Sequence, residues 1–148
     1  MVQFLGVISH DVVPTLLAAA DVAVAPSVHD DAGNVDGLPN TVMEIMASAT
    51  PLVTTPAGGI SAVATDGVTA RLVPERDVRA LAWAIDELLR DRAAAAHMGR
   101  QARDLVCRHH GWARVAGDFE AVYEVAKRRG ANGAPQAERP ERVLGPRE

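Results

Sequence analysis

The sequence predicts an α/β domain in which helices flank a parallel sheet, followed by a segment made of helices alone. Short apolar runs alternate with helical patterns as far as Pro74, which is typical of parallel strands joined by right-handed crossovers. Beyond Pro74 only helical periodicity remains. At 148 residues, 48% hydrophobic and 23% charged, the chain has the length and composition of one folded domain, too short for a complete two-domain enzyme.

The first part of the chain predicts strands and helices in alternation. Residues 2–8 and 21–26 are short apolar runs expected to form buried strands, and an alanine-rich helix lies between them, with Pro14 suited to its first turn. Further strands are expected at 51–55 and 69–73, preceded by helices at 38–48 and 60–65.

The second part of the chain predicts three helices, over 77–90, 92–108 and 112–129. The last helix carries an apolar stripe from Trp112 to Ala126 that needs a covering surface, whereas Trp83 is expected to pack between helices. From Gly130 onward glycine, proline and mixed charge predict a disordered tail. The predicted domain therefore spans 1–129 and the tail 130–148.

Composition excludes several classes of partner. The net charge is -4 and the basic residues are mixed with acids, so nucleic acid is not an expected partner. No apolar run approaches the roughly 20 residues that cross a bilayer, and the first residues lack the pattern of a signal peptide. We expect a cytoplasmic protein, with a peripheral position at the inner membrane face as the alternative.

The stretch from residue 26 to 48 carries the chemistry. It begins where a predicted strand ends and passes through a polar loop into a helix, which is where open parallel sheets bind ligands. Pro39 favours a helix start at that point, so the amides of Asn40 and Thr41 are expected to be free of helical partners. The positive end of the helix macrodipole lies behind these amides, and the helix start is therefore predicted to receive an anion.

Two carboxylates flank this helix start. Asp36 precedes the helix and Glu44 lies within it, about ten ångströms further along at a rise of about 1.5 Å per residue. Carboxylates accept hydrogen bonds from hydroxyls. An anion between two hydroxyl-bearing groups describes a nucleotide sugar, with a diphosphate in the middle, ribose on one side and hexose on the other.

The sequence here resembles the C-terminal, donor-binding domain of family 4 retaining glycosyltransferases of the GT-B type. The resemblance covers about residues 2–127 and rests on two acids separated by seven residues, Asp36 and Glu44, within DGLPNTVMEIMAS, with PS before them and PLVTT, GGI and DG after them. It implies a Rossmann-like parallel sheet with flanking helices, here a partial GT-B C-terminal domain that is truncated at its N-terminus and ends in a helical segment.

The resemblance also implies residue roles. The acid that matches Glu44 accepts the ribose hydroxyls, and the acid that matches Asp36 contacts the transferred sugar. Amides matching Gly37, Leu38, Asn40 and Thr41 meet the sugar and the diphosphate, and the turn that includes Ile8 borders the base. Asp36 and Glu44 are therefore the expected catalytic-site acids, and the donor is a nucleotide-diphosphate sugar with no cofactor and no metal.

Several differences from the family pattern affect the expected activity. Asp36 replaces the usual glutamate and Ala49 a common glycine. The acceptor-binding domain and the first strand–helix units are missing, together with the Arg and Lys that neutralise the diphosphate; the single lysine is Lys127. We expect the chain alone to be inactive and to need the missing N-terminal acceptor domain, an equivalent chain or self-association.

Other functions are open from the residues alone. His29, Asp30, Asp31 and Asp36 are also compatible with a metal site, and the two acids with a hydrolase pair. His109 and His110 are expected at a helix junction rather than in catalysis. A non-catalytic nucleotide-sugar-binding or interaction module, and a sugar-nucleotide epimerase of the same architecture, are the alternative functions.

Overall fold

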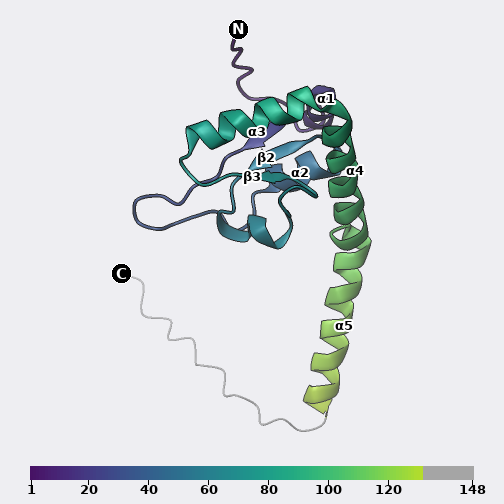
Figure 1. Ribbon diagram of the computed structural model, residues 1–148. Helices are drawn as coiled ribbons and strands as arrows, with labels where there is room; N and C mark the ends of the chain where they lie inside the picture. Colours follow the sequence, from purple (N-terminus) through teal and green to yellow (C-terminus); the bar gives the residue numbers. More distant parts are fainter. Residues whose placement is uncertain (132–148) are drawn as a thin grey trace, which may run out of the picture. The chain divides into compact units, whose positions relative to one another are not determined.

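A computed structural model describes residues 1–131, which divide into two compact units at Gly111 (Figure 1). The first unit contains a three-stranded sheet, four α-helices and one 3-10 helix, η1. The second unit contains helix α5, Trp112–Ala131, within the described residues. The elements of the first unit are α1 Val13–Ala19, β1 Ala23–Ala25, α2 Asn40–Ala47, β2 Leu52–Thr54, η1 Gly58–Ala62, β3 Arg71–Leu72, α3 Val78–Arg90 and α4 Arg92–His109.

The sheet is parallel throughout, in the order β1-β2-β3, which confirms the predicted α/β architecture. The central strand β2 is buried along its whole length, as expected for a parallel strand covered on both faces. The hydroxyl of Thr54 donates to the carbonyl oxygen of Ala25 at 2.7 Å, and that of Thr55 donates to the carbonyl oxygen of Ser27. These bonds satisfy buried hydroxyls and fasten the segment that follows β1 to the central strand.

Neighbouring residues of β2 point to opposite faces of the sheet and define two apolar clusters. Leu52 packs with α2 and η1, through residues such as Ile45 and Ile60. Val53 packs with α3, through residues such as Leu88. Helix α4 contributes to both clusters, with Ala95 and Met98 in the α3 cluster and Ala102 and Val106 in the α2 cluster.

The helix ends explain where these helices begin and stop. Asp77 and Asp91 accept hydrogen bonds at 2.9 Å from the amides of Ala80 and Ala94, and so cap α3 and α4. Arg103 of α4 donates to the carbonyl oxygen of Ala47, placing a cation at the C-terminus of α2. The predicted helices at 38–48, 77–90 and 92–108 are thus confirmed with small shifts in their ends.

The strand predicted at 2–8 is wrong. These residues lie outside every helix and strand, and their side chains are exposed. Hydrogen-bonded pairing in the sheet joins β1 to β2 and β2 to β3, and residues 2–8 pair with none of these strands. Without a neighbour to share backbone hydrogen bonds, the apolar run has no sheet to join.

Helix α5 confirms the last predicted helix and extends it to Ala131. Its exposed large apolar side chains are Trp112, Phe119, Val122, Tyr123 and Val125. The rings of Phe119 and Tyr123 stack with centroids 6.3 Å apart. The rest of the predicted tail, residues 132–148, lies outside the described residues. Among the helices that are described, none has the length and hydropathy needed to span a bilayer.

Candidate functional site

The loop that follows β1 is closed on itself by one carboxylate. Oδ1 of Asp30 accepts hydrogen bonds from the amides of Ala32 and Asn34, at 2.9 and 2.7 Å, and Oδ2 accepts one from the Asn34 side chain at 2.9 Å. The Asn34 side-chain amide, and then its backbone amide, lower the pKa of Asp30 below its ordinary value. Both carboxylate oxygens of Asp30 are thus engaged by groups of its own loop. The same oxygens would be needed as ligands by a metal ion.

A second contact joins this loop to the segment after β3. Oε2 of Glu75 accepts a hydrogen bond from the amide of His29 at 2.8 Å, and Oε1 lies 2.8 Å from Nδ1 of the same residue. Arg76 donates to the carbonyl oxygen of His29 at 2.7 Å. The backbone amide of His29, followed by its ring, lowers the pKa of Glu75. We call these bonds the His29 contacts.

The exit of the loop rests on the glycine pair before η1. The amide of Gly59 donates to the carbonyl oxygen of Gly37. A Cβ on Gly58 would lie 2.1 Å from the carbonyl oxygen of Asp36, and one on Gly59 would lie 2.6 Å from that of Gly37. Only glycines allow the two backbones to approach so closely. Asp36 and Gly37 are thereby held against the segment that follows β2.

Helix α2 begins where the sequence predicts. Pro39 is the N-cap with an extended backbone, and no side chain caps the helix. The first bonded amide is that of Val42, which donates to the carbonyl oxygen of Pro39 at 3.1 Å. Within residues 1–131 the amides of Asn40 and Thr41 have no acceptor. Leu38 and Gly37 precede them with exposed surface, so the helix start is open to an anion.

The two predicted acids lie in separate surface hollows. Asp36 is exposed and lines a hollow of about 390 Å³ together with residues of its own loop. Glu44 is half-buried and lines a hollow of about 450 Å³ between α1 and α2, together with His10, Leu17 and Arg103. No residue lines both hollows. Neither carboxylate accepts a hydrogen bond from any described residue, so both can accept one from a ligand.

The structure groups the other predicted residues unequally. Gly37, Leu38, Asn40 and Thr41 lie beside Asp36 along the chain, at the start of α2. Ile8 is 37% exposed in the segment before α1 and lines neither hollow; His10, two residues later, does line the hollow of Glu44. The roles assigned to these residues remain predictions.

The alternative of a metal site finds no matching geometry. In the part of the chain that the structure describes, no three His, Cys, Asp or Glu side chains converge on one point. His29 faces Glu75 and Asp30 faces its own loop amides, while Asp31 lies 3.5 Å from Arg76.

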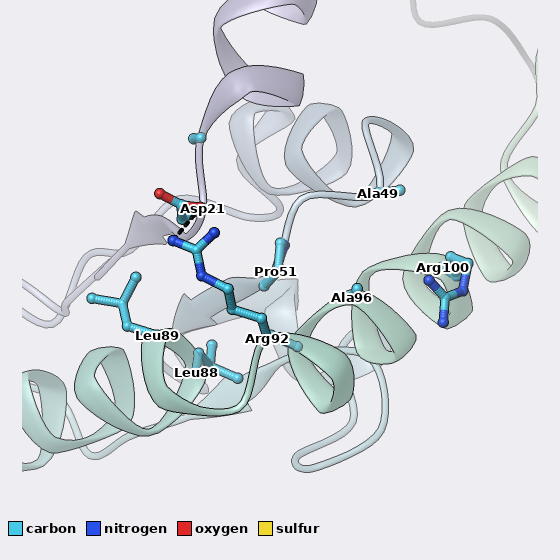
Figure 2. A pocket seen from close by; sticks show the side chains of 10 residues that line it. Asp21, Ala49, Pro51, Leu88, Leu89, Arg92, Ala96 and Arg100 are labelled. Carbon is cyan, nitrogen blue, oxygen red and sulfur yellow. Dashed lines mark ion pairs between the residues drawn. The ribbon is translucent and has the colours of Figure 1, made fainter.

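A further hollow lies at the opposite end of the sheet. It measures about 340 Å³ and lies beside Asp21 and Pro51, which come shortly before β1 and β2 (Figure 2). Arg92 of α4 reaches across it to Asp21, with 3.2 Å between nitrogen and oxygen, and Arg100 lies two turns further along the helix (Figure 2). Parallel sheets bind ligands at the carboxyl ends of their strands, so this hollow is separate from the candidate site.

Sequence reasoning missed Glu75 and Arg76. Glu75 stands 46 residues from the amide that it binds, and no short motif links the two positions. The glycine pair at 58–59 was part of the recognised pattern, but its contact with Asp36 and Gly37 was not predicted.

Comparison with known proteins identifies the family. Residues 1–91 match the family model described as glycosyl transferases group 1. The chain belongs to this family. The glycogen synthase of Mycobacterium tuberculosis is 36% identical over 126 residues, a match that covers 85% of this chain and 29% of the synthase.

Solved glycosyltransferase structures confirm the fold. The sucrose-phosphate synthase of Thermosynechococcus elongatus has a TM-score of 0.76 and 29% identity, over 86% of this chain and 30% of that one. Anabaena Alr3699/HepE, solved in complex with UDP-glucose, has a TM-score of 0.62 and 20% identity, over 78% of this chain and 30% of its own. The sheet and its helices are thus part of a GT-B fold. The chain spans less than a third of the length of each of these three proteins.

Proposed function

We propose that the chain provides the donor-binding half of a glycosyltransferase that transfers a hexosyl group, with retention, from a nucleotide-diphosphate sugar to an acceptor. One observation carries the proposal. In a group 1 glycosyltransferase chain, the free amides of Asn40 and Thr41 open α2, with the unpaired carboxylate of Asp36 before them and that of Glu44 after them. A diphosphate at the amides would direct ribose and hexose towards different acids.

Each part of the donor then has a partner. Glu44 accepts the ribose hydroxyls in the hollow between α1 and α2, and the segment from Ile8 to His10 borders the base. Asp36 accepts hydroxyls of the transferred sugar, and the amides at Gly37 and Leu38 complete that side. The glycosidic bond to the diphosphate breaks, the acceptor oxygen forms the new bond, and the acceptor proton leaves with the diphosphate.

Charge limits what this chain does alone. A helix start offers about half a positive charge, worth up to about 2 kcal/mol, against a diphosphate with about two negative charges. The single lysine, Lys127, belongs to α5, and the arginine beside the hollow of Glu44, Arg103, already donates to the carbonyl oxygen of Ala47. We therefore expect millimolar donor affinity and no turnover from the chain by itself, with the remaining charge and the acceptor site supplied by a further domain, an equivalent chain or a second copy.

The same shortage of positive charge favours one second candidate, a non-catalytic module that binds nucleotide sugars. Both candidates fit a cytoplasmic protein, because nucleotide sugars are charged and do not cross a bilayer unaided. Turnover distinguishes the two candidates. Complementation of the chain with the acceptor half of a related enzyme restores transfer under the first candidate and gives binding only under the second.

Nuclear magnetic resonance titration of the ¹⁵N-labelled chain tests donor binding at weak affinity. UDP-, GDP- and ADP-glucose are the probes, and we expect shifts concentrated at Asn40, Thr41 and Glu44 for the matching base. Glu44→Ala should remove binding, whereas Glu120→Ala, which changes an exposed glutamate of α5, should leave it unchanged. Shifts that avoid α2, or equal binding by the Glu44 variant, contradict the proposal.

A further inference from the structure

The His29 contacts cross the end of the central strand. His29 follows β1 and Glu75 follows β3, and β2 lies between those strands in the sheet. Both oxygens of the Glu75 carboxylate are engaged, one by the amide of His29 and one by its ring, and the guanidinium of Arg76 holds the carbonyl oxygen of the same residue. Because a carboxylate only accepts, the imidazole carries a proton on Nδ1.

These contacts differ from an ordinary surface ion pair. Two exposed charged side chains that meet contribute little, since they are solvated and free to separate. Here the contacts fix backbone groups, and the Glu75 side chain is only 25% exposed. Arg76 holds a backbone φ of 61°, a left-handed conformation that is unfavourable for a non-glycine residue. Such a conformation persists where surrounding contacts hold it, and the bond from Arg76 to His29 is one of them.

The segment from His29 to Asp36 is fixed at three points. The His29 contacts hold its start, Asp30 closes the loop as far as Asn34, and Gly58 supports the carbonyl of Asp36. The closure by Asp30 is internal to the segment and cannot place it on the domain. Its position therefore depends on the His29 contacts at one end, beside which the exposed Asp31 lies 3.5 Å from Arg76, and on the glycine pair at the other end.

We propose that Glu75 is a positioning residue that, together with Arg76, places the loop of Asp36 and so sets the affinity for the sugar half of the donor. The inference rests on the proposed function, in which Asp36 meets the sugar and Glu44 the ribose. The two acids line hollows with no residue in common. Loosening the loop therefore weakens binding of a nucleotide sugar and leaves binding of the corresponding nucleoside diphosphate unchanged.

Hydrogen exchange tests the positioning itself and needs no ligand. Glu75→Gln keeps one carbonyl oxygen, which is uncharged and therefore a weaker acceptor for the amide and the ring of His29, whereas Glu75→Ala keeps none. The amide of His29 should exchange faster in Glu75→Gln than in wild type, and fastest in Glu75→Ala. Glu87→Gln is the matched control. Glu87 is a partly exposed acid of α3 that pairs with Arg71 of β3, away from the loop. Equal exchange in wild type and both Glu75 variants overturns the inference.

Titration then tests the effect on the donor. For the base that binds, the Kd of the NDP-glucose and of the NDP are measured in wild type, Glu75→Gln and Glu87→Gln. We expect a loss of about tenfold for the NDP-glucose in Glu75→Gln, the size of one lost hydrogen bond, with the NDP and the Glu87 control unchanged. Faster exchange with an unchanged ratio of the two Kd values overturns the positioning role and leaves the proposed function intact. A wild type that binds neither ligand contradicts the proposed function and the affinity half of this inference, while exchange still decides the placement of the loop.

Discussion

The amide of Gly59 donates a hydrogen bond to the carbonyl oxygen of Gly37, so the segment after β2 directly supports the loop that leads into α2. The neighbouring Gly58 has a positive φ of 57° and lies against the carbonyl of Asp36. The glycine pair thus couples the central strand to the proposed sugar side of the donor site.

Gly59→Ala is expected to displace this loop. The new Cβ would lie 2.6 Å from the carbonyl oxygen of Gly37, a backbone atom that moves only with its loop. Overpacking of this kind costs about 1–3 kcal/mol, so the free energy of unfolding in urea should fall by that amount. The amide resonances of Gly37, Leu38, Asn40 and Thr41 should also move. Unchanged resonances there would show that the loop does not depend on this contact.

Gly99→Ala is expected to separate α4 from α2. A Cβ at this position would lie 2.1 Å from the carbonyl oxygen of Ala49, and both clusters of the core depend on α4. We expect a loss of at least about 1–3 kcal/mol in the free energy of unfolding. Gly117→Ala is the control, because nothing lies within 4 Å of its added Cβ, and it should raise the helicity of α5. Similar stability of the two variants would refute the close approach of α4.

Ala49→Gly is expected to stabilise the first unit. Ala49 has a φ of 59° just beyond α2, and the left-handed conformation costs an L-residue about 1–2 kcal/mol. Relief of that cost should raise the unfolding free energy by about 1 kcal/mol. Ala96→Gly, in the middle of α4, should lower it by about 1 kcal/mol instead. The prediction fails if both glycines destabilise equally.

The loop of Asp30 is expected to open in acid. Its hydrogen bonds hold the pKa of Asp30 below the ordinary value of 3.8. A carboxylate whose pKa is lowered by folding stabilises the folded state. This stabilisation is complete at pH values above the ordinary pKa and is lost as the pH falls through the lowered pKa. The amide shifts of Ala32 and Asn34 should therefore stay constant from pH 7 to about 4 and change below it. The control variant Asp31→Asn should show the same transition. If the transition persists in Asp30→Ala, it belongs to another titrating group and the prediction is wrong.

The helices were predictable because their signals are local. Asp77 and Asp91 cap α3 and α4, Pro39 marks the start of α2, and apolar spacing reports the buried faces. The apolar run at 2–8 carried an equally clear strand signal, but a strand forms only beside another strand, and pairing is not a local property.

In the candidate site, too, local features were predictable and contacts between distant residues were not. The open start of α2 follows from Pro39 and from helix geometry, so the sequence predicted it. The hydrogen bond from the amide of His29 to Glu75 depends on β1 and β3 lying on either side of β2, which no residue spacing reveals. Trp83 was expected between helices but is 60% exposed, with the Arg71 guanidinium 5.8 Å from its ring centre. The spacing of residues along a helix does not reveal this contact, because Arg71 belongs to the strand β3.

The separation of the two hollows has a consequence for engineering. If the nucleoside half of the donor meets α1, α2, the segment before α1 and Arg103 of α4, then residues 6–18 can be exchanged for those of a relative that uses another base. The loop of Asp36 remains untouched in such a chimera. Base preference and sugar preference should then change independently, as two modules of one donor site.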